Sequence, residues 1–131
     1  LAWKLRSDPR VVSREQFNLR HMKREDVGQD VDFLVADLSF ISLTLVLPAV
    51  LQVLRPGGQA VVLVKPQFEL SREEVGAGGI VREPELHAKA CARIENFVRS
   101  QPQLAWESLV ESNLQGTDGN REFLAWFRVR E

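Results

Sequence analysis

Two apolar runs that flank a helical pattern constrain the fold more than any other feature of this 131-residue chain. They lie in the stretch Asp32–Glu69, DFLVADLSFISLTLVLPAVLQVLRPGGQAVVLVKPQFE. The first run, Val31–Ala36, is short and apolar, as expected of a strand that is covered on both faces. The second, Gln59–Lys65, is rich in β-branched residues and also predicts a strand. With a helix between them that reaches about Leu54, the stretch predicts a right-handed βαβ unit.

Local signals set the ends of the predicted helix. Ser39 or Ser42 can cap its N-terminus, and Pro48 must either kink the helix or lie in its first turn. The turn Arg55-Pro56-Gly57-Gly58 should end it, because glycine supplies a left-handed residue and proline cannot continue a helix.

A charged residue closes each apolar run. Asp37 follows the first run, and Lys65, which Pro66 follows, closes the second. In an open parallel sheet, ligands bind outside the carboxyl ends of the strands. We therefore expect Asp37 and Lys65 to lie together at a site.

The rest of the chain predicts a further layer of helix and strand. We expect helices at Leu1–Arg6 and Glu85–Ser100, a helical turn at Met22–Val27 ending at Gly28, strands at Arg10–Ser13, Leu104–Val110 and Arg121–Arg130, and a turn at Gly116–Asn120. The connection Pro66–Pro84 is long enough to predict a functional lid or binding loop, although a solvated connection is an equally good interpretation. The order of elements is that of an α/β fold that finishes in an antiparallel hairpin.

The closing hairpin should place a third charged residue near Asp37 and Lys65. A strand that runs antiparallel to the first two begins at the edge where they end, so Glu122, the second residue of Arg121–Arg130, is expected beside Asp37 and Lys65. A carboxylate can hold a lysine ammonium in place, while burial favours the neutral amine, which can act as a base. The residues alone leave two interpretations open: a catalytic site, or a structural ion pair at the rim of the sheet.

Composition restricts the class of protein. Lys and Arg number 17 against 18 Asp and Glu, which argues against a strongly basic wrapper of nucleic acid but not against a nucleic-acid enzyme. The single cysteine, Cys91, is expected to be a small core residue of a helix, with no internal disulfide. The longest apolar run, Ile41–Leu54, is too short to span a bilayer. These features predict one cytoplasmic domain without membrane attachment.

Several motifs occur in order along the chain: DLSFISL, LRPGG, VLVKPQFE, GAGGIVRE followed by a histidine (His87), and GTDGNREFL. Together they resemble the FtsJ-type methyltransferase domain of the TlyA or hemolysin A family of ribosomal RNA 2′-O-methyltransferases. The opening LAWKLRSDPRVV and the later FNLRH resemble the same family, so the resemblance covers nearly the whole chain. It implies a Rossmann-like S-adenosylmethionine-dependent methyltransferase fold, with a mostly parallel sheet that ends in an antiparallel hairpin.

The resemblance also implies catalytic residues. The family uses a Lys-Asp-Lys-Glu tetrad to methylate a ribose 2′-hydroxyl: Asp37 in DLSF matches its aspartate, Lys65 in VKPQFE its second lysine, and Glu122 in GNREFL its glutamate. Lys65 would take or stabilise the hydroxyl proton, while Asp37 and Glu122 orient and tune the lysines. No metal is expected, because the sulfonium methyl of S-adenosylmethionine is already activated.

Residues that bind S-adenosylmethionine follow from the same resemblance. Asn18 matches a position that contacts the adenine, with Phe17 beside it as a stacking surface. Leu38 and Phe40 flank Asp37, and all three are expected at the cofactor. For Phe17, Leu38 and Phe40, a place in the hydrophobic core is an equally good interpretation.

Three parts of the family pattern have no match in residues 1–131. They are the glycine-rich cofactor motif of the first strand, the acidic residue that ends the second, and the first lysine of the tetrad. In the family these lie before the position of Leu1, as does an S4-like RNA-binding domain. The sequence is therefore expected to be an N-terminally truncated, partial FtsJ-like methyltransferase domain that lacks its first strands and is inactive alone.

Other functions compete with an RNA 2′-O-methyltransferase that acts on ribosomal RNA or a ribosomal subunit. A non-catalytic Rossmann-like RNA-binding or vestigial module stays open, because part of the cofactor motif is missing. A hemolysin-type membrane activity is disfavoured by the lack of a spanning segment or a basic amphipathic helix. A nicotinamide-dependent enzyme is disfavoured by the lack of a dinucleotide fingerprint.

Overall fold

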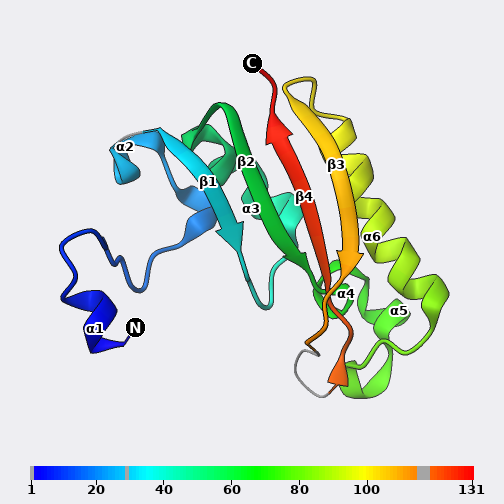
Figure 1. Cartoon of the computed structure of the whole chain (residues 1–131). Helices are drawn as coiled ribbons and strands as arrows, with labels where there is room; N and C mark the ends of the chain where they lie inside the picture. Colours follow the sequence, from blue (N-terminus) through cyan, green and yellow to red (C-terminus); the bar gives the residue numbers. More distant parts are fainter. Residues whose placement is uncertain (1, 29, 115–118) are drawn as a thin grey trace.

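A four-stranded sheet in the order β1-β2-β4-β3 forms the centre of the molecule (Figure 1). The computed structural model describes residues 2–28, 30–114 and 119–131. The strands are β1 (Val31–Ala36), β2 (Leu54–Val64), β3 (Leu104–Glu111) and β4 (Phe123–Val129). β1 pairs parallel to β2, and β4 pairs antiparallel to β2 and β3. The α/β class and the closing hairpin are confirmed, but the described sheet is mixed rather than mostly parallel.

Two main helices, α3 and α6, cover one face of this sheet (Figure 1). The helices are α1 (Trp3–Arg6), α2 (Arg24–Val27), α3 (Leu43–Val50), α4 (Pro66–Glu69), α5 (Arg72–Val75) and α6 (Pro84–Arg99), with 3-10 turns η1 (Leu19–His21), η2 (Leu51–Val53) and η3 (Ala77–Gly79). The short helices α4 and α5 lie at the edge where β1 and β2 end and β4 begins (Figure 1). This edge is where the sequence places the charged residues.

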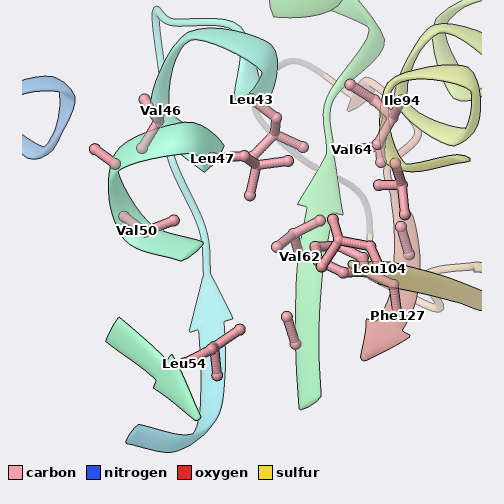
Figure 2. Packing of buried hydrophobic residues seen from close by; sticks show 14 of the residues in the cluster. Leu43, Val46, Leu47, Val50, Leu54, Val62, Val64, Ile94, Leu104 and Phe127 are labelled. Atoms are coloured by element: carbon pink, nitrogen blue, oxygen red, sulfur yellow. The ribbon is translucent and has the colours of Figure 1, made fainter. Parts of the chain in front are cut away.

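The core lies between the sheet and the two helices. Alternate residues of β2 and β4 point into it, because successive side chains of a strand point to opposite faces. The strand residues Ala60, Val62, Val64, Ala125 and Phe127, together with Leu47 of α3 and Ile94 of α6, are 0% exposed and form one cluster (Figure 2). Each large apolar side chain buried in this way contributes about 1.5–3 kcal/mol. In β4, the buried Ala125 and Phe127 alternate with exposed residues, as expected of a strand with one covered face.

The other face of the sheet is largely open in the described part of the chain. Val35 and Phe33 of β1 are 72% and 52% exposed, and Trp126 of β4 is 39% exposed. The prediction that Val31–Ala36 is covered on both faces is therefore wrong, because α3 and α6 both lie on the opposite face.

The helix after β1 differs from the prediction in length. Ser42, and not Ser39, caps α3, and its Oγ accepts a hydrogen bond from the backbone N–H of Thr44 (3.2 Å). Pro48 lies inside the helix rather than in its first turn, and α3 ends two residues later at Val50. Proline removes one hydrogen bond to the preceding turn, and the chain continues past Val50 as the 3-10 turn η2 to Val53.

The Arg-Pro-Gly-Gly sequence lies within β2 as a bulge and does not form a separate turn. Val31 pairs with Leu54 but Phe33 already pairs with Gln59, so β2 carries extra residues here. Gly57 has φ +80°, which confirms the expected left-handed residue. A Cβ at Gly58 would lie 2.8 Å from the carbonyl oxygen of Arg55.

Two predictions near the ends of the chain are wrong. No strand forms at residues 10–13, because no described strand lies beside them to complete a ladder of hydrogen bonds. Glu122 precedes β4 and is not its second residue. The helical turn that ends at Gly28 is confirmed, with φ +82° at the glycine. Of the predicted turn Gly116–Asn120, residues 116–118 lie outside the described part of the chain.

The long connection after Lys65 is folded rather than open. Ser71 and Glu74 cap α5 reciprocally, and Glu74 forms ion pairs with Lys89 and Arg93 of α6. The hydrogen bond from Lys89, followed by those from Ser71 and Arg93, lowers the pKa of Glu74 to about 2. The connection is thus held against α6.

Candidate active site

An ion pair between Lys65 and Asp37 lies at the carboxyl ends of the two parallel strands. Lys65 Nζ is 2.5 Å from Asp37 Oδ1, and it donates a longer hydrogen bond to Ser39 Oγ (3.4 Å). The lysine side chain is only 11% exposed, whereas the aspartate side chain is 65% exposed. The two residues therefore meet as expected, with the lysine enclosed and the carboxylate facing solvent.

Glu122 lies at the same edge of the sheet as Lys65. The β2–β4 ladder ends at the pair Val64–Phe123, and Lys65 follows this pair on one side while Glu122 precedes it on the other. In the described structure, no hydrogen bond or ion pair joins the two side chains.

Phe40 is the most unusual residue around the ion pair. It adopts φ +65°, a conformation that is strained for a bulky side chain. It is also 89% exposed, and its ring lies 5.0 Å from that of Phe68. A place for Phe40 in the hydrophobic core is therefore excluded.

The other residues expected at the cofactor line two adjoining cavities. Phe17, Asn18 and Leu38 line one of about 180 Å3. Asp37 and Leu38 line a larger one of about 510 Å3, whose other walls are apolar. Asn18 Oδ1 accepts a hydrogen bond from the backbone N–H of Arg20 and so caps η1. The structure thus brings these four residues to one side of the end of β1, whereas Phe40 lines neither cavity.

Glu69 is a residue of this region that the sequence analysis did not identify. Its Oε2 accepts a hydrogen bond from Ser42 Oγ (2.6 Å), and its Oε1 accepts one from the backbone N–H of Leu43 (2.8 Å). Burial raises the pKa of Glu69, and these hydrogen bonds oppose the rise. No local signal indicates this role, because both partners precede Glu69 by 26 or more residues.

Two buried polar side chains form hydrogen bonds with the backbone of Gly79 and Val81. Asn120 Oδ1 accepts from the backbone N–H of Val81 (2.9 Å), and its Nδ2 donates to the carbonyl oxygen of Gly79 (3.0 Å). His87 Nε2 lies 2.8 Å from the carbonyl oxygen of Val81. His87 is thus buried in the first turn of α6, and Cys91, one turn later, is buried as expected.

Neither a membrane span nor a metal centre is found in the described residues. None of their helices is both long and apolar enough to cross a bilayer. Within the same residues, no three His, Cys, Asp or Glu side chains are grouped so that they could hold a metal ion.

Comparison with known proteins gives matches along almost the whole chain. Residues 1–129 match the model of the FtsJ-like methyltransferases. The 16S/23S rRNA (cytidine-2′-O)-methyltransferase TlyA of Mycobacterium tuberculosis is 44% identical over 132 residues, which cover 99% of this chain and 48% of that protein. Hemolysin A of Brachyspira hyodysenteriae is 35% identical over 98% of this chain and 54% of its own length. The chain thus spans about half the length of the curated relatives it matches.

Solved structures agree with these matches. A candidate hemolysin from Streptococcus thermophilus superposes with a TM-score of 0.93 at 44% identity, over 100% of this chain and 47% of the other. The N-methyltransferase NodS of Bradyrhizobium japonicum, in complex with S-adenosyl-L-homocysteine, has a TM-score of 0.52 at 14% identity over 88% of this chain and 53% of its own, a likeness of fold alone. The Rossmann-like methyltransferase fold is therefore confirmed. The chain belongs to the FtsJ-like methyltransferase family, with homologues named TlyA and Hemolysin A.

Proposed function

We propose that the protein carrying this chain methylates a ribose 2′-hydroxyl of ribosomal RNA, with Lys65 as the base. The observation that carries the proposal is the enclosed Lys65 side chain against Asp37, at the ligand edge of a methyltransferase sheet. The name of the TlyA relative, which includes 2′-O-methylation of rRNA, supports the choice of substrate.

The proposed chemistry is a transfer of one methyl group to the 2′-oxygen. The ribose oxygen attacks the methyl carbon in line with the leaving sulfur, and the hydroxyl proton passes to the amine of Lys65. Asp37 orients Lys65 through the ion pair, and Glu122 contributes a second negative charge on the same edge. The two carboxylates place negative charge near the ammonium that forms when Lys65 accepts the proton.

S-adenosylmethionine is the proposed methyl donor, and it supplies a positively charged sulfonium whose methyl group needs no further activation. Phe17, Asn18 and Leu38 would bind its adenosine part in the cavities beside β1. Asp37 lines the larger cavity and also pairs with Lys65, so one ligand can reach both. Apolar walls with few polar groups are typical of small-molecule sites. Phe40 is proposed as a further ligand contact at the rim, since it is strained and exposed.

The test is methyl transfer by the complete natural protein, because the first tetrad lysine and the glycine-rich motif have no counterpart in residues 1–131. With labelled S-adenosylmethionine and ribosomal subunits, Lys65→Ala should abolish transfer while the thermal unfolding midpoint stays close to wild type. Lys4→Ala, which removes an exposed lysine of α1, is the matched control and should leave transfer unchanged.

The position of the label identifies the reaction. A 2′-O-methyl group protects the adjacent phosphodiester from alkaline cleavage, so the product should appear as an alkali-resistant dinucleotide. Full transfer by Lys65→Ala would contradict the role of this lysine. Binding of RNA by the wild-type protein without any transfer would instead favour the non-catalytic module.

A further inference from the structure

Two segments leave the ends of the parallel strands, and they run along each other. The first, Asp37–Ser42, connects β1 to α3, and the second, Lys65–Glu69, contains α4. They touch at both ends and in the middle. Lys65 contacts Asp37 and Ser39, Phe68 contacts Phe40, and Glu69 contacts Ser42 and Leu43.

Glu69 makes the most enclosed of these contacts. Each of its carboxylate oxygens accepts one hydrogen bond from the start of α3, at 2.6 Å from Ser42 Oγ and at 2.8 Å from the backbone N–H of Leu43. The Lys65–Asp37 contact at the other end is open to solvent on the aspartate side. An exposed ion pair alone holds two flexible side chains weakly.

The backbone of Glu69 is also held in place by α6. Arg93 of α6 donates a hydrogen bond to the backbone carbonyl oxygen of Glu69 (2.8 Å). Lys65 is the N-cap residue of α4, and its backbone carbonyl oxygen accepts from the N–H of Phe68 (2.9 Å). A rigid path of four residues therefore connects Lys65 to the carboxylate that holds the start of α3.

The geometry points to Glu69 as a positioning residue that fixes the Asp37–Ser42 segment against Lys65 and thereby sets the geometry of the site. The inference rests on the proposed function, because it gives Glu69 a part in placing the same lysine and aspartate. Glu69 touches neither residue itself, and it acts through Ser42 and Leu43.

Five variants of the complete natural protein test this role, with kcat, the two KM values and the pH dependence of kcat as readouts. Glu69→Ala should lower kcat by roughly 10- to 100-fold, because a displacement of about 1 Å at a catalytic group can cost that much. The KM for S-adenosylmethionine should rise as well, because Leu38 and Phe40 of the displaced segment are proposed ligand contacts, while the KM for RNA should change little. The pH profile of kcat should shift because Asp37 no longer has a fixed place beside Lys65. Glu69→Gln should restore activity, since its amide can accept from Leu43 and donate to Ser42.

Glu74→Ala is the matched control. It removes a carboxylate from the same connection, together with its ion pairs to Lys89 and to Arg93 Nη2. It leaves in place the carbonyl oxygen of Glu69 that Arg93 Nη1 binds and every group that contacts the Asp37–Ser42 segment. Its kcat and pH profile should stay near wild type even where its unfolding midpoint falls. Ser42→Ala should lower kcat less than Glu69→Ala, and the double variant should be no slower than Glu69→Ala, because both changes break the same contact.

The outcomes separate this inference from the proposed function. If Lys65→Ala abolishes transfer while Glu69→Ala behaves like Glu74→Ala, the positioning role is wrong and the proposed function stands. If Glu69→Gln is as slow as Glu69→Ala with an unshifted pH profile, the role is also wrong. If Lys65→Ala transfers methyl groups normally, the proposed function fails, whatever the Glu69 variants do.

Discussion

Lys65 and Asp37 form an ion pair of 2.5 Å in which the lysine side chain is 11% exposed and the aspartate 65% exposed. The pair joins two strands at their carboxyl ends, and it is asymmetric. The enclosed amine suits a group that exchanges a proton with a substrate, and the exposed carboxylate contributes little to folding stability.

Asp37→Asn should therefore separate catalysis from stability. The amide keeps the size of the side chain but removes its charge, so kcat for methyl transfer should fall roughly 10²- to 10³-fold, while the unfolding midpoint barely moves. Asp32→Asn is the control, since Asp32 is an exposed carboxylate at the other end of β1 that pairs with Arg55. Equal activity of the two variants would contradict a catalytic part for Asp37.

The two faces of β2 should respond differently to the same substitution. Val62 is 0% exposed in the core, whereas Val61 lies on the open face of the sheet. Val62→Ala should lower the free energy of unfolding by about 2–3 kcal/mol, from the lost methyl groups and the cavity they leave. Val61→Ala should cost less than about 1 kcal/mol. Denaturant titration of both variants measures the difference, and equal costs would contradict an open face.

Gly58 should tolerate no side chain. An added Cβ would meet the carbonyl oxygens of Arg55 at 2.8 Å and Asp32 at 3.2 Å, so Gly58→Ala should destabilise the protein by about 1–3 kcal/mol. Gly28→Ala separates this clash from backbone strain, because its φ is +82° but nothing lies within 4 Å of the added Cβ. It should cost about 1 kcal/mol. A cost at Gly58 no greater than at Gly28 would contradict the close packing of the bulge.

The contribution of Glu74 to the stability of the fold should be lost in acid. Its pKa falls from 4.5 to about 2, mainly through Lys89, so its contribution is fully present above pH 4.5 and is lost as the pH falls toward about 2. Thermal unfolding across this range should show a smaller loss of stability for Glu74→Gln than for wild type. Parallel curves for the two proteins would show that the carboxylate is not paired in solution.

The contribution of Glu69 to stability should depend on pH in the opposite direction. Burial raises its pKa above 4.5, so its contribution to stability is greatest below pH 4.5 and declines as the pH rises through the raised value. Glu69→Gln should remove this decline and be at least as stable as wild type at neutral pH. A variant much less stable than wild type at neutral pH would show that the hydrogen bonds outweigh the cost of burying the charge.

The single cysteine should be unreactive in the folded protein. Cys91 is 8% exposed, and burial raises the pKa of its thiol to about 11. Since the thiolate is the reactive form, iodoacetamide at neutral pH should label Cys91 only after unfolding. Labelling of the native protein at the rate of the unfolded chain would contradict the packing of α6.

Most of the fold follows from short-range patterns. The strand Val31–Ala36 has the predicted bounds, because a short apolar run between polar residues is typical of a strand. The alternation of Phe123–Val129 indicates which side chains enter the core, because a strand has a period of two. The expected meeting of Asp37 and Lys65 needs only the rule that parallel strands end at one edge. Their roles and those of Phe17, Asn18, Leu38, Phe40 and Glu122 stay predictions.

Other features depend on partners that are distant in the sequence. The pattern of Arg55–Gly58 predicts a turn, but pairing with β1 draws these residues into a bulge of β2. The apolar side chains of Phe33 and Val35 predict burial on two faces, but both main helices pack on the other face. Neither arrangement can be predicted from local propensity, because each depends on which elements pack together.

The sequence by itself determined the strand and helix types, the family pattern and the edge at which the charged residues gather. All of these depend on side-chain periodicity and on the direction of strands. Only the tertiary structure decided that Lys65 is enclosed while Asp37 is exposed, and that Glu69 holds the start of α3. Burial and hydrogen bonding between residues 26 or more positions apart are set by packing, and packing is a property of the whole fold.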